Sequence, residues 1–418
     1  MGQVNKISSR ERVLKAFEFR PSDRIPVDLS GHRSSGLSAM LYPKLRSALG
    51  LKPAPVRIYD PVQQLAILDN DVLDLLGVDT IELGRAFALD DKDWRPWVLP
   101  DGTDCFLPSW VNPEREERRW ILRSKTGRII AQMPDGARFF EQVWYPFYQE
   151  DADTGNIKSA MQESMWHTVV SPPGPLGDGP EGEQLLRKSA RKLRQSTDRA
   201  IIGLFGGNLL ETGQMLYRND KFLLMLAMDP PAVHDFLDRL TEIHMQDLER
   251  FLGAVGDSID IILFGDDLGM QSGPQMSPEM YREYFKPRHQ MMWSLAKELA
   301  NVKVMLHCCG GVRELLSDLI DAGLDTINPV QITARGMEAG QLKKDFGREI
   351  VFWGGGCDTQ QVLPNGSPQE VYDHVTTQLE ILSPGGGFVF QQVHNILPEV
   401  PIENILAMFS SIKDFNVN

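Results

Sequence analysis

Three residues of the types that bind transition metals lie at the ends of two apolar segments. His307 and Cys309 end the segment 302–309, and Cys357 follows a run of glycines after the segment 350–353. Side chains alternate along an extended strand, so His307 and Cys309 point to the same side. Imidazole and thiolate favour zinc, and three ligands with one open position are typical of catalytic zinc. We therefore predict a catalytic zinc site formed by His307, Cys309 and Cys357.

A structural role for these cysteines is the alternative, because free cysteine often fills space in a protein core. Cys308 must point away from its neighbour Cys309, and we predict it in the core. Cys105 lies in a polar stretch and carries no motif. Glycines after both apolar segments allow close approach of a ligand, which favours the metal site at the other two cysteines.

Composition and charge restrict the class of protein. The chain has 418 residues, 42% hydrophobic and 24% charged, which is ordinary for a globular protein. No apolar run reaches the roughly 18 residues of a membrane span, and residues 1–9 lack the apolar core of a signal peptide. We expect a cytoplasmic protein with reduced cysteines. A net charge of −14 argues against nucleic acid and anionic membrane as partners. The oligomeric state is left open.

Eight apolar segments recur along the chain with helical patterns between them. Such runs are typical of parallel strands covered on both faces, and eight alternating units predict a (β/α)8 TIM barrel. We expect one domain over 1–418, with an N-terminal helix opening at Ser9. The predicted strands are 25–30, 80–84, 200–206, 259–266, 302–308, 324–330, 350–354 and 387–393.

Residues 90–150 differ from the rest and are predicted to form an antiparallel β insertion. The segment 125–127 between two apolar runs is a hairpin signal, and tryptophans and tyrosines are frequent. These aromatic side chains either wall an apolar pocket or pack within the β layer. Helical patterns are expected near 60–77 and 213–226, among other places.

The barrel would bring chemically useful residues to one face, because the carboxyl ends of its strands hold the active site. We predict His394 as a proton donor or hydrogen-bond partner of substrate, and Asp267 as a second catalytic residue. Asp266 points the opposite way and can cap a turn. Asn395 and His32 are predicted to bind a cofactor or substrate. The remaining histidines are predicted to be surface or core residues: His167, His234, His244, His289 and His374.

Ordered motifs along this barrel resemble the uroporphyrinogen decarboxylase superfamily, and most closely its zinc- and corrinoid-dependent methyltransferases. The resemblance covers nearly the whole chain outside 90–150. It rests on residues 24–28 (RIPVD), 265–271 (GDDLGMQ), 277–287 (SPEMYREYFKP), 307–310 (HCCG), 354–360 (GGGCDTQ), 386–388 and 403–404. In that branch a His-x-Cys and a distant Cys bind zinc, which implies His307, Cys309 and Cys357. Decarboxylation of porphyrinogens is disfavoured, because the segment 29–36 holds one arginine where the decarboxylases are arginine-rich.

The resemblance implies methyl transfer between a small methylated substrate and the cobalt of a corrinoid on a partner protein. We choose an O-methyl aromatic compound as donor, with zinc as Lewis acid toward the ether oxygen. A methylcobalamin:thiol transferase of the coenzyme M type is the first alternative. A metal-free, decarboxylase-like lyase and a barrel with a purely structural zinc are the others.

Overall fold

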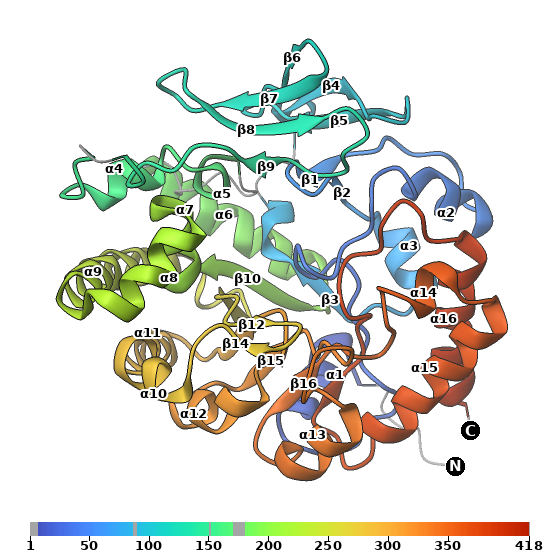
Figure 1. Cartoon of the computed structure of the whole chain (residues 1–418). Helices are drawn as coiled ribbons and strands as arrows, with labels where there is room; N and C mark the ends of the chain where they lie inside the picture. Colours follow the sequence, from blue (N-terminus) through green and yellow to red (C-terminus); the bar gives the residue numbers. More distant parts are fainter. Residues whose placement is uncertain (1–6, 87–89, 150–151, 170–179, 418) are drawn as a thin grey trace.

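Seven parallel strands in sequence order form the main sheet of the computed structural model (Figure 1). The structure describes residues 7–86, 90–149, 152–169 and 180–417. Each of these strands pairs with the next one along the chain, and the sheet curls around a common axis. The predicted TIM barrel is therefore confirmed. The strands are β3 (Thr80–Glu82), β10 (Ala200–Gly206), β11 (Ile261–Gly265), β14 (Lys303–His307), β15 (Thr326–Asn328), β16 (Val351–Trp353) and β17 (Phe388–Val389).

An extended segment, residues 25–28, closes the barrel between β17 and β3. Phe390 donates its backbone N–H to the carbonyl of Pro26 over 2.8 Å, and Asp28 donates to Phe390 over 2.8 Å. On the other side, Asp79 donates to the carbonyl of Val27 over 2.7 Å. The predicted strand 25–30 is therefore reduced to a single bridge at Val27. Pro26 has no N–H to donate, which shortens the ladder at this position.

Helix α1 (Ser9–Ala16) covers the amino-terminal end of the barrel. Its Val13 and Ala16 pack on inward-facing side chains of the strands, among them Ile202 and Trp353. Ser8 caps the helix and forms a reciprocal capping box with Glu11. With one end filled in this way, the open end is the one at which the strands finish.

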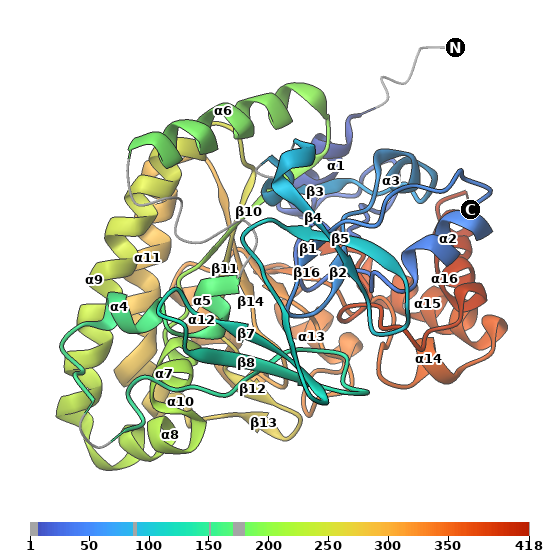
Figure 2. The same cartoon turned by 90° about the horizontal axis from the view of Figure 1, so that it is seen from above.

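Helices surround the barrel in the two views (Figures 1 and 2). Their bounds are α2 (Tyr42–Ala48), α3 (Asn70–Leu75), α4 (Ile157–Met161), α5 (Met165–Val169), α6 (Pro180–Ser196), α7 (Leu210–Tyr217), α8 (Asn219–Met228), α9 (Pro230–Val255), α10 (Pro278–Met280), α11 (Lys286–Leu299), α12 (Leu316–Asp321), α13 (Ala339–Phe346), α14 (Val362–Asn365), α15 (Pro368–Leu382) and α16 (Ile402–Phe415). None of the helices in these described ranges is long and apolar enough to cross a membrane.

The expected antiparallel insertion is present as a layer on one side of the barrel (Figure 1). Its strands are β4 (Trp94–Val98), β5 (Asp104–Pro108), β6 (Glu114–Glu116), β7 (Arg119–Arg123), β8 (Ile129–Pro134) and β9 (Glu141–Gln142). The hairpin signal at 125–127 joins β7 to β8, and Gly127 has φ 87°. Trp97 and Trp120 meet edge to face with ring centroids 5.6 Å apart, so these aromatic rings pack within the layer.

Two helical expectations are wrong in detail. Part of the predicted helix 60–77 is a β hairpin of β1 (Ile58–Asp60) and β2 (Leu65–Ala66). The predicted helix 213–226 is divided into α7 and α8 at Arg218, whose φ of 72° is incompatible with a continuing right-handed helix.

Candidate metal and substrate site

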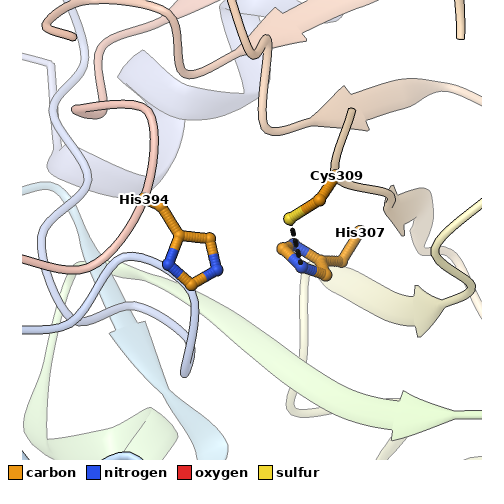
Figure 3. Close-up of side chains that lie close together, drawn as sticks. All are labelled: His307, Cys309 and His394. Carbon is orange, nitrogen blue, oxygen red and sulfur yellow. Dashed lines mark hydrogen bonds between the residues drawn. The ribbon is translucent and has the colours of Figure 1, made fainter. Parts of the chain in front are cut away.

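Three side chains meet at the carboxyl ends of β14 and β17: His307, Cys309 and His394 (Figure 3). One ligand atom from each lies within 4.8 Å of the other two. The Nε2 atom of His307 is 3.5 Å from Sγ of Cys309. Two such ligands on one tetrahedral zinc are about 3.6 Å apart, given Zn–N and Zn–S bonds of about 2.1 and 2.3 Å. The His-x-Cys pair is therefore already spaced for this metal.

The ring of His307 is oriented by Asn328 at the end of β15. The Asn328 amide donates to Gln391 Oε1 over 2.6 Å and to the Trp353 carbonyl over 3.2 Å, which fixes its oxygen toward His307. Nδ1 of His307 donates to that oxygen over 2.9 Å. Its Nε2 is consequently the unprotonated atom and faces Cys309, as a metal ligand requires.

Backbone contacts around residue 309 place its thiol. The N–H of Cys309 donates to Oδ1 of Asp267 over 2.7 Å. The next N–H, of Gly310, donates to Oε1 of Gln331 over 2.7 Å. Gly310 has φ 87°, and a Cβ there would lie 2.4 Å from the backbone of Gly269, so only glycine permits this turn.

Cys357, predicted as the third ligand, is fully buried and is not among the three converging residues. Its Sγ lies 3.9 Å from the carbonyl oxygen of Asp358. Burial raises the pKa of this thiol, with Asp358 adding to the effect. Its ligand role stays a prediction, and His394 occupies the third position of the group in the structure.

Asp266 and Asp267 diverge, as strand alternation requires. Asp266 is fully buried and accepts from the backbone N–H groups of Leu209, Leu210 and Glu211 at 3.0–3.2 Å, which caps α7. Asp267 instead lies 3.9 Å from Nε2 of His307 and faces the site.

His32 and Asn395 hold the chain around the site. His32 is fully buried; its Nδ1 accepts from Ser34 N over 3.2 Å, and its Nε2 lies 3.3 Å from both Gln391 and Asp28. Asn395 accepts from Gly36 N over 2.6 Å and donates to Gln63 over 2.8 Å. Their predicted ligand-binding roles remain predictions. Cys308 is buried in the core, as expected.

The electrostatics of the group suit a cation. Burial, with the neighbouring His307 and His32, lowers the pKa of His394 to about 3, so its imidazole is neutral and able to coordinate. Burial also lowers the pKa of His307. Burial and Asp267 raise the pKa of the Cys309 thiol, an effect that a bound cation reverses. Two neutral imidazoles and one thiol fit zinc.

A cavity of about 420 Å³ opens from this group along the ends of β10 and β11 to α5 and α9. This volume is in the range of small-molecule sites. None of its lining residues belongs to the part of 90–149 that the structure describes, so the insertion does not wall it. Its apolar lining comprises Met161, Trp166, Leu204, Phe205, Met215, Ile243, Phe251, Leu263 and Phe264.

The polar cavity residues that sequence reasoning missed include two histidines and a glutamate. His167 and His244 were expected only as surface or core residues, and Glu211 was not singled out; all three line the cavity. Burial, Asp267 and Asp266 raise the pKa of the Glu211 carboxyl well above its usual value. These residues lie on helices, where no strand-end argument finds them.

Known proteins resemble the chain at low identity. A uroporphyrinogen decarboxylase of Coxiella burnetii is 23% identical over 46% of this chain and 50% of its own length. A methylated-thiol–coenzyme M methyltransferase of Methanosarcina mazei is 27% identical over 44% of this chain and 46% of its own length. A methylcobamide:CoM methyltransferase of Methanosarcina barkeri is 25% identical over 43% of this chain and 50% of its own length. These matches thus span about half the length of each relative.

A solved methyltransferase structure from Methanosarcina mazei has the same fold. It superposes with a TM-score of 0.60 at 18% identity and covers 98% of this chain and 99% of its own. The family model for uroporphyrinogen decarboxylase (URO-D) matches residues 170–415, more than half of the chain. The chain therefore belongs to the uroporphyrinogen decarboxylase family, with corrinoid-linked methyltransferases among its relatives.

Proposed function

We propose that this protein is a zinc-dependent methyltransferase that moves a methyl group from an aryl methyl ether to the cobalt of a corrinoid protein. The observation that carries the proposal is the aromatic-lined cavity with His307, Cys309 and His394 at one end. The methyltransferases among the relatives support the reaction class. We place the reaction in the cytoplasm, with the corrinoid protein as partner.

His307, Cys309 and His394 would hold the zinc, and all three residues line the cavity. When bound, zinc supplies Lewis acidity toward an ether oxygen, which makes phenolate a better leaving group. In this proposal His394 acts as the third ligand, in place of the predicted Cys357 and instead of as a proton donor. The reason is that one ligand atom from each of His307, Cys309 and His394 lies within 4.8 Å of the other two.

The residues around the group have positioning roles in this proposal. Asn328 holds His307 with Nε2 toward the zinc position, and Asp267 holds the backbone of Cys309. Phe205 and Phe264 lie edge to face with centroids 5.4 Å apart on the cavity wall and offer apolar surface to an aromatic ring.

The test combines the purified protein, a methoxyarene and a corrinoid protein reduced to cobalt(I). We expect loss of the cobalt(I) absorption and one equivalent of phenol for each methyl group moved. Simple dialkyl ethers are the matched control and should not react, because an alkoxide is a far more basic leaving group. Consumption of methyl-cobalt(III) with a thiol, and no reaction with aryl ethers, would replace this proposal by thiol methylation.

A further inference from the structure

Two histidines line the cavity on elements that do not contribute to the metal group. His167 lies on α5 and His244 on α9, whereas His307 ends β14 and Cys309 follows that strand. Burial lowers the pKa of His167 to about 4, with His244 as a smaller contributor, and burial also lowers the pKa of His244. Both rings are therefore neutral at physiological pH, and each has one donor and one acceptor nitrogen.

Hydrogen bonds assign the protons on both rings. The hydroxyl of Ser164 donates to the carbonyl of Met161 over 2.9 Å, so it accepts from Nδ1 of His167 over 2.8 Å. Nε2 of His167 is then the acceptor. Nε2 of His244 lies 3.1 Å from the carbonyl of Asn208, which only accepts, so Nδ1 of His244 is the acceptor. Each ring thus keeps an acceptor nitrogen that makes no hydrogen bond within the described residues.

The cations of the cavity wall are neutralised by carboxylates. Lys158 lies 3.4 Å from Asp247, and Arg250 lies 3.0 Å from Glu183. Arg33 lies 3.6 Å from Asp60, and its guanidinium stacks 5.6 Å from the Trp166 ring centroid. The wall also carries the acidic side chain of Asp267, whereas the Glu211 carboxyl, whose pKa is raised well above its usual value, adds no negative charge. Burial of a carboxylate or sulfonate of the ligand beside Asp267 would be costly, so the ligand that fits is neutral.

The lining therefore specifies an apolar ring that carries a hydrogen-bond donor. The ring centroid of Phe205 lies 5.8 Å from that of Phe251 and 5.4 Å from that of Phe264, and Trp166 lines the same cavity. An ether oxygen cannot donate to an imidazole acceptor, but a phenolic hydroxyl can.

We propose that Nε2 of His167, on the same cavity wall as His244, accepts a hydrogen bond from a ring hydroxyl, so that the preferred substrates are neutral methoxyphenols. This inference rests on the aryl ether proposed above and deepens it. A substrate hydroxyl bound in this way fixes the rotation of the ring about its own axis. The methoxy group is thereby directed to the end of the cavity formed by His307, Cys309 and His394.

The experiment measures binding to the full-length protein by calorimetry, without corrinoid, so that no turnover occurs. The probes are the three methoxyphenol isomers, methoxybenzene and 4-methoxybenzoate. We expect at least one methoxyphenol to bind about fivefold or more tighter than methoxybenzene, the size of effect expected when a buried acceptor is left unpaired. The benzoate should bind most weakly of all.

Two variants test whether His167 causes the preference for methoxyphenol over methoxybenzene. His167→Phe should remove the discrimination between methoxyphenol and methoxybenzene, whereas His167→Gln, which keeps an acceptor, should retain part of it. A cooperative melt of each variant shows that it is folded. Equal binding of methoxyphenol and methoxybenzene by the parent protein overturns this inference alone, and so does tightest binding of the benzoate. Failure of every aryl ether to bind overturns the aryl substrate of the proposed function as well.

Discussion

Nδ1 of His307 donates to Oδ1 of Asn328 over 2.9 Å, and this bond leaves Nε2 free to face the thiol of Cys309. Loss of such a supporting contact typically lowers metal affinity by about 10–100-fold. We expect Asn328→Ala to weaken zinc binding in this range, measured by competition with a chromogenic chelator. Unchanged zinc affinity in a variant that still melts cooperatively would contradict the assigned ring orientation.

Zinc content distinguishes the two candidate third ligands. The purified protein should hold about one zinc per chain, and Cys309→Ala or His394→Ala should lose most of it. Cys308→Ala is the matched control, because its thiol points into the core beside Cys309. Atomic absorption on each variant measures the outcome. Zinc lost in Cys357→Ala but retained in His394→Ala would restore our original ligand set.

Removal of the metal should abolish methyl transfer without unfolding the chain. The barrel has its own large core and α1 fills one end, unlike small domains that depend on zinc to fold. Protein treated with a chelator should keep its far-UV circular dichroism and a cooperative thermal transition. Re-addition of zinc should restore turnover. Global unfolding on chelation would instead support a structural metal.

His167 should make stability depend on pH. Its pKa is about 4 when folded and about 6.5 when unfolded, so between these values only the unfolded state binds the proton. The free energy of unfolding should therefore fall as pH drops from 6.5 to 4. Glutamine does not titrate, so over this window His167→Gln should lose roughly 1–2 kcal/mol less stability than the parent protein. This difference is smaller than the full pKa shift implies, because the His167 ring also lines the cavity. Urea titrations of the chelated proteins at pH 7, 5.5 and 4.5 measure this, and parallel curves would contradict it.

Substitution of Asp79 is predicted to lower the free energy of unfolding more than substitution of most other charged residues of the barrel. It is fully buried and accepts from Arg12, from Arg24 and from the backbone of Val27 at 2.7–3.0 Å. Removal of one partner from a buried ion pair typically costs about 3–5 kcal/mol. Asp79→Asn should show such a loss in chemical denaturation. Asp135→Asn, whose pair with Arg115 is exposed, should cost less than about 1 kcal/mol.

The barrel was predictable because its strands are continuous apolar runs separated by helical patterns. The His-x-Cys pair followed from strand alternation, and His307 and Cys309 do face one point. The same argument does not extend to Cys357, because Gly354 and Gly355 before it have φ of 104° and 79° and turn the chain. The position of His394 next to His307 and Cys309 could not be predicted either, because it depends on how the loops fold over the open end of the barrel.

The helical cavity residues could not be found by this reasoning. His167 and His244 come to line one cavity only after α5 and α9 have packed against the barrel, and no spacing in the sequence links them. Arg218 likewise gave no sign that its backbone would adopt a positive φ and divide one predicted helix into two.

The segment 25–28 is a sparsely bonded joint between β17 and β3. Pro26, Val27 and Asp28 connect to both neighbouring strands through individual backbone bonds instead of a continuous ladder. The chain then runs directly to Arg33 and Ser34 on the cavity wall, and Ser34 Oγ lies 3.3 Å from Nε2 of His307. Local opening at this joint therefore loosens the wall, and a ligand that requires the wall intact suppresses the opening. Amide hydrogen exchange at residues 27–36 should accordingly slow when the cavity is filled, which makes the joint a direct reporter of occupancy.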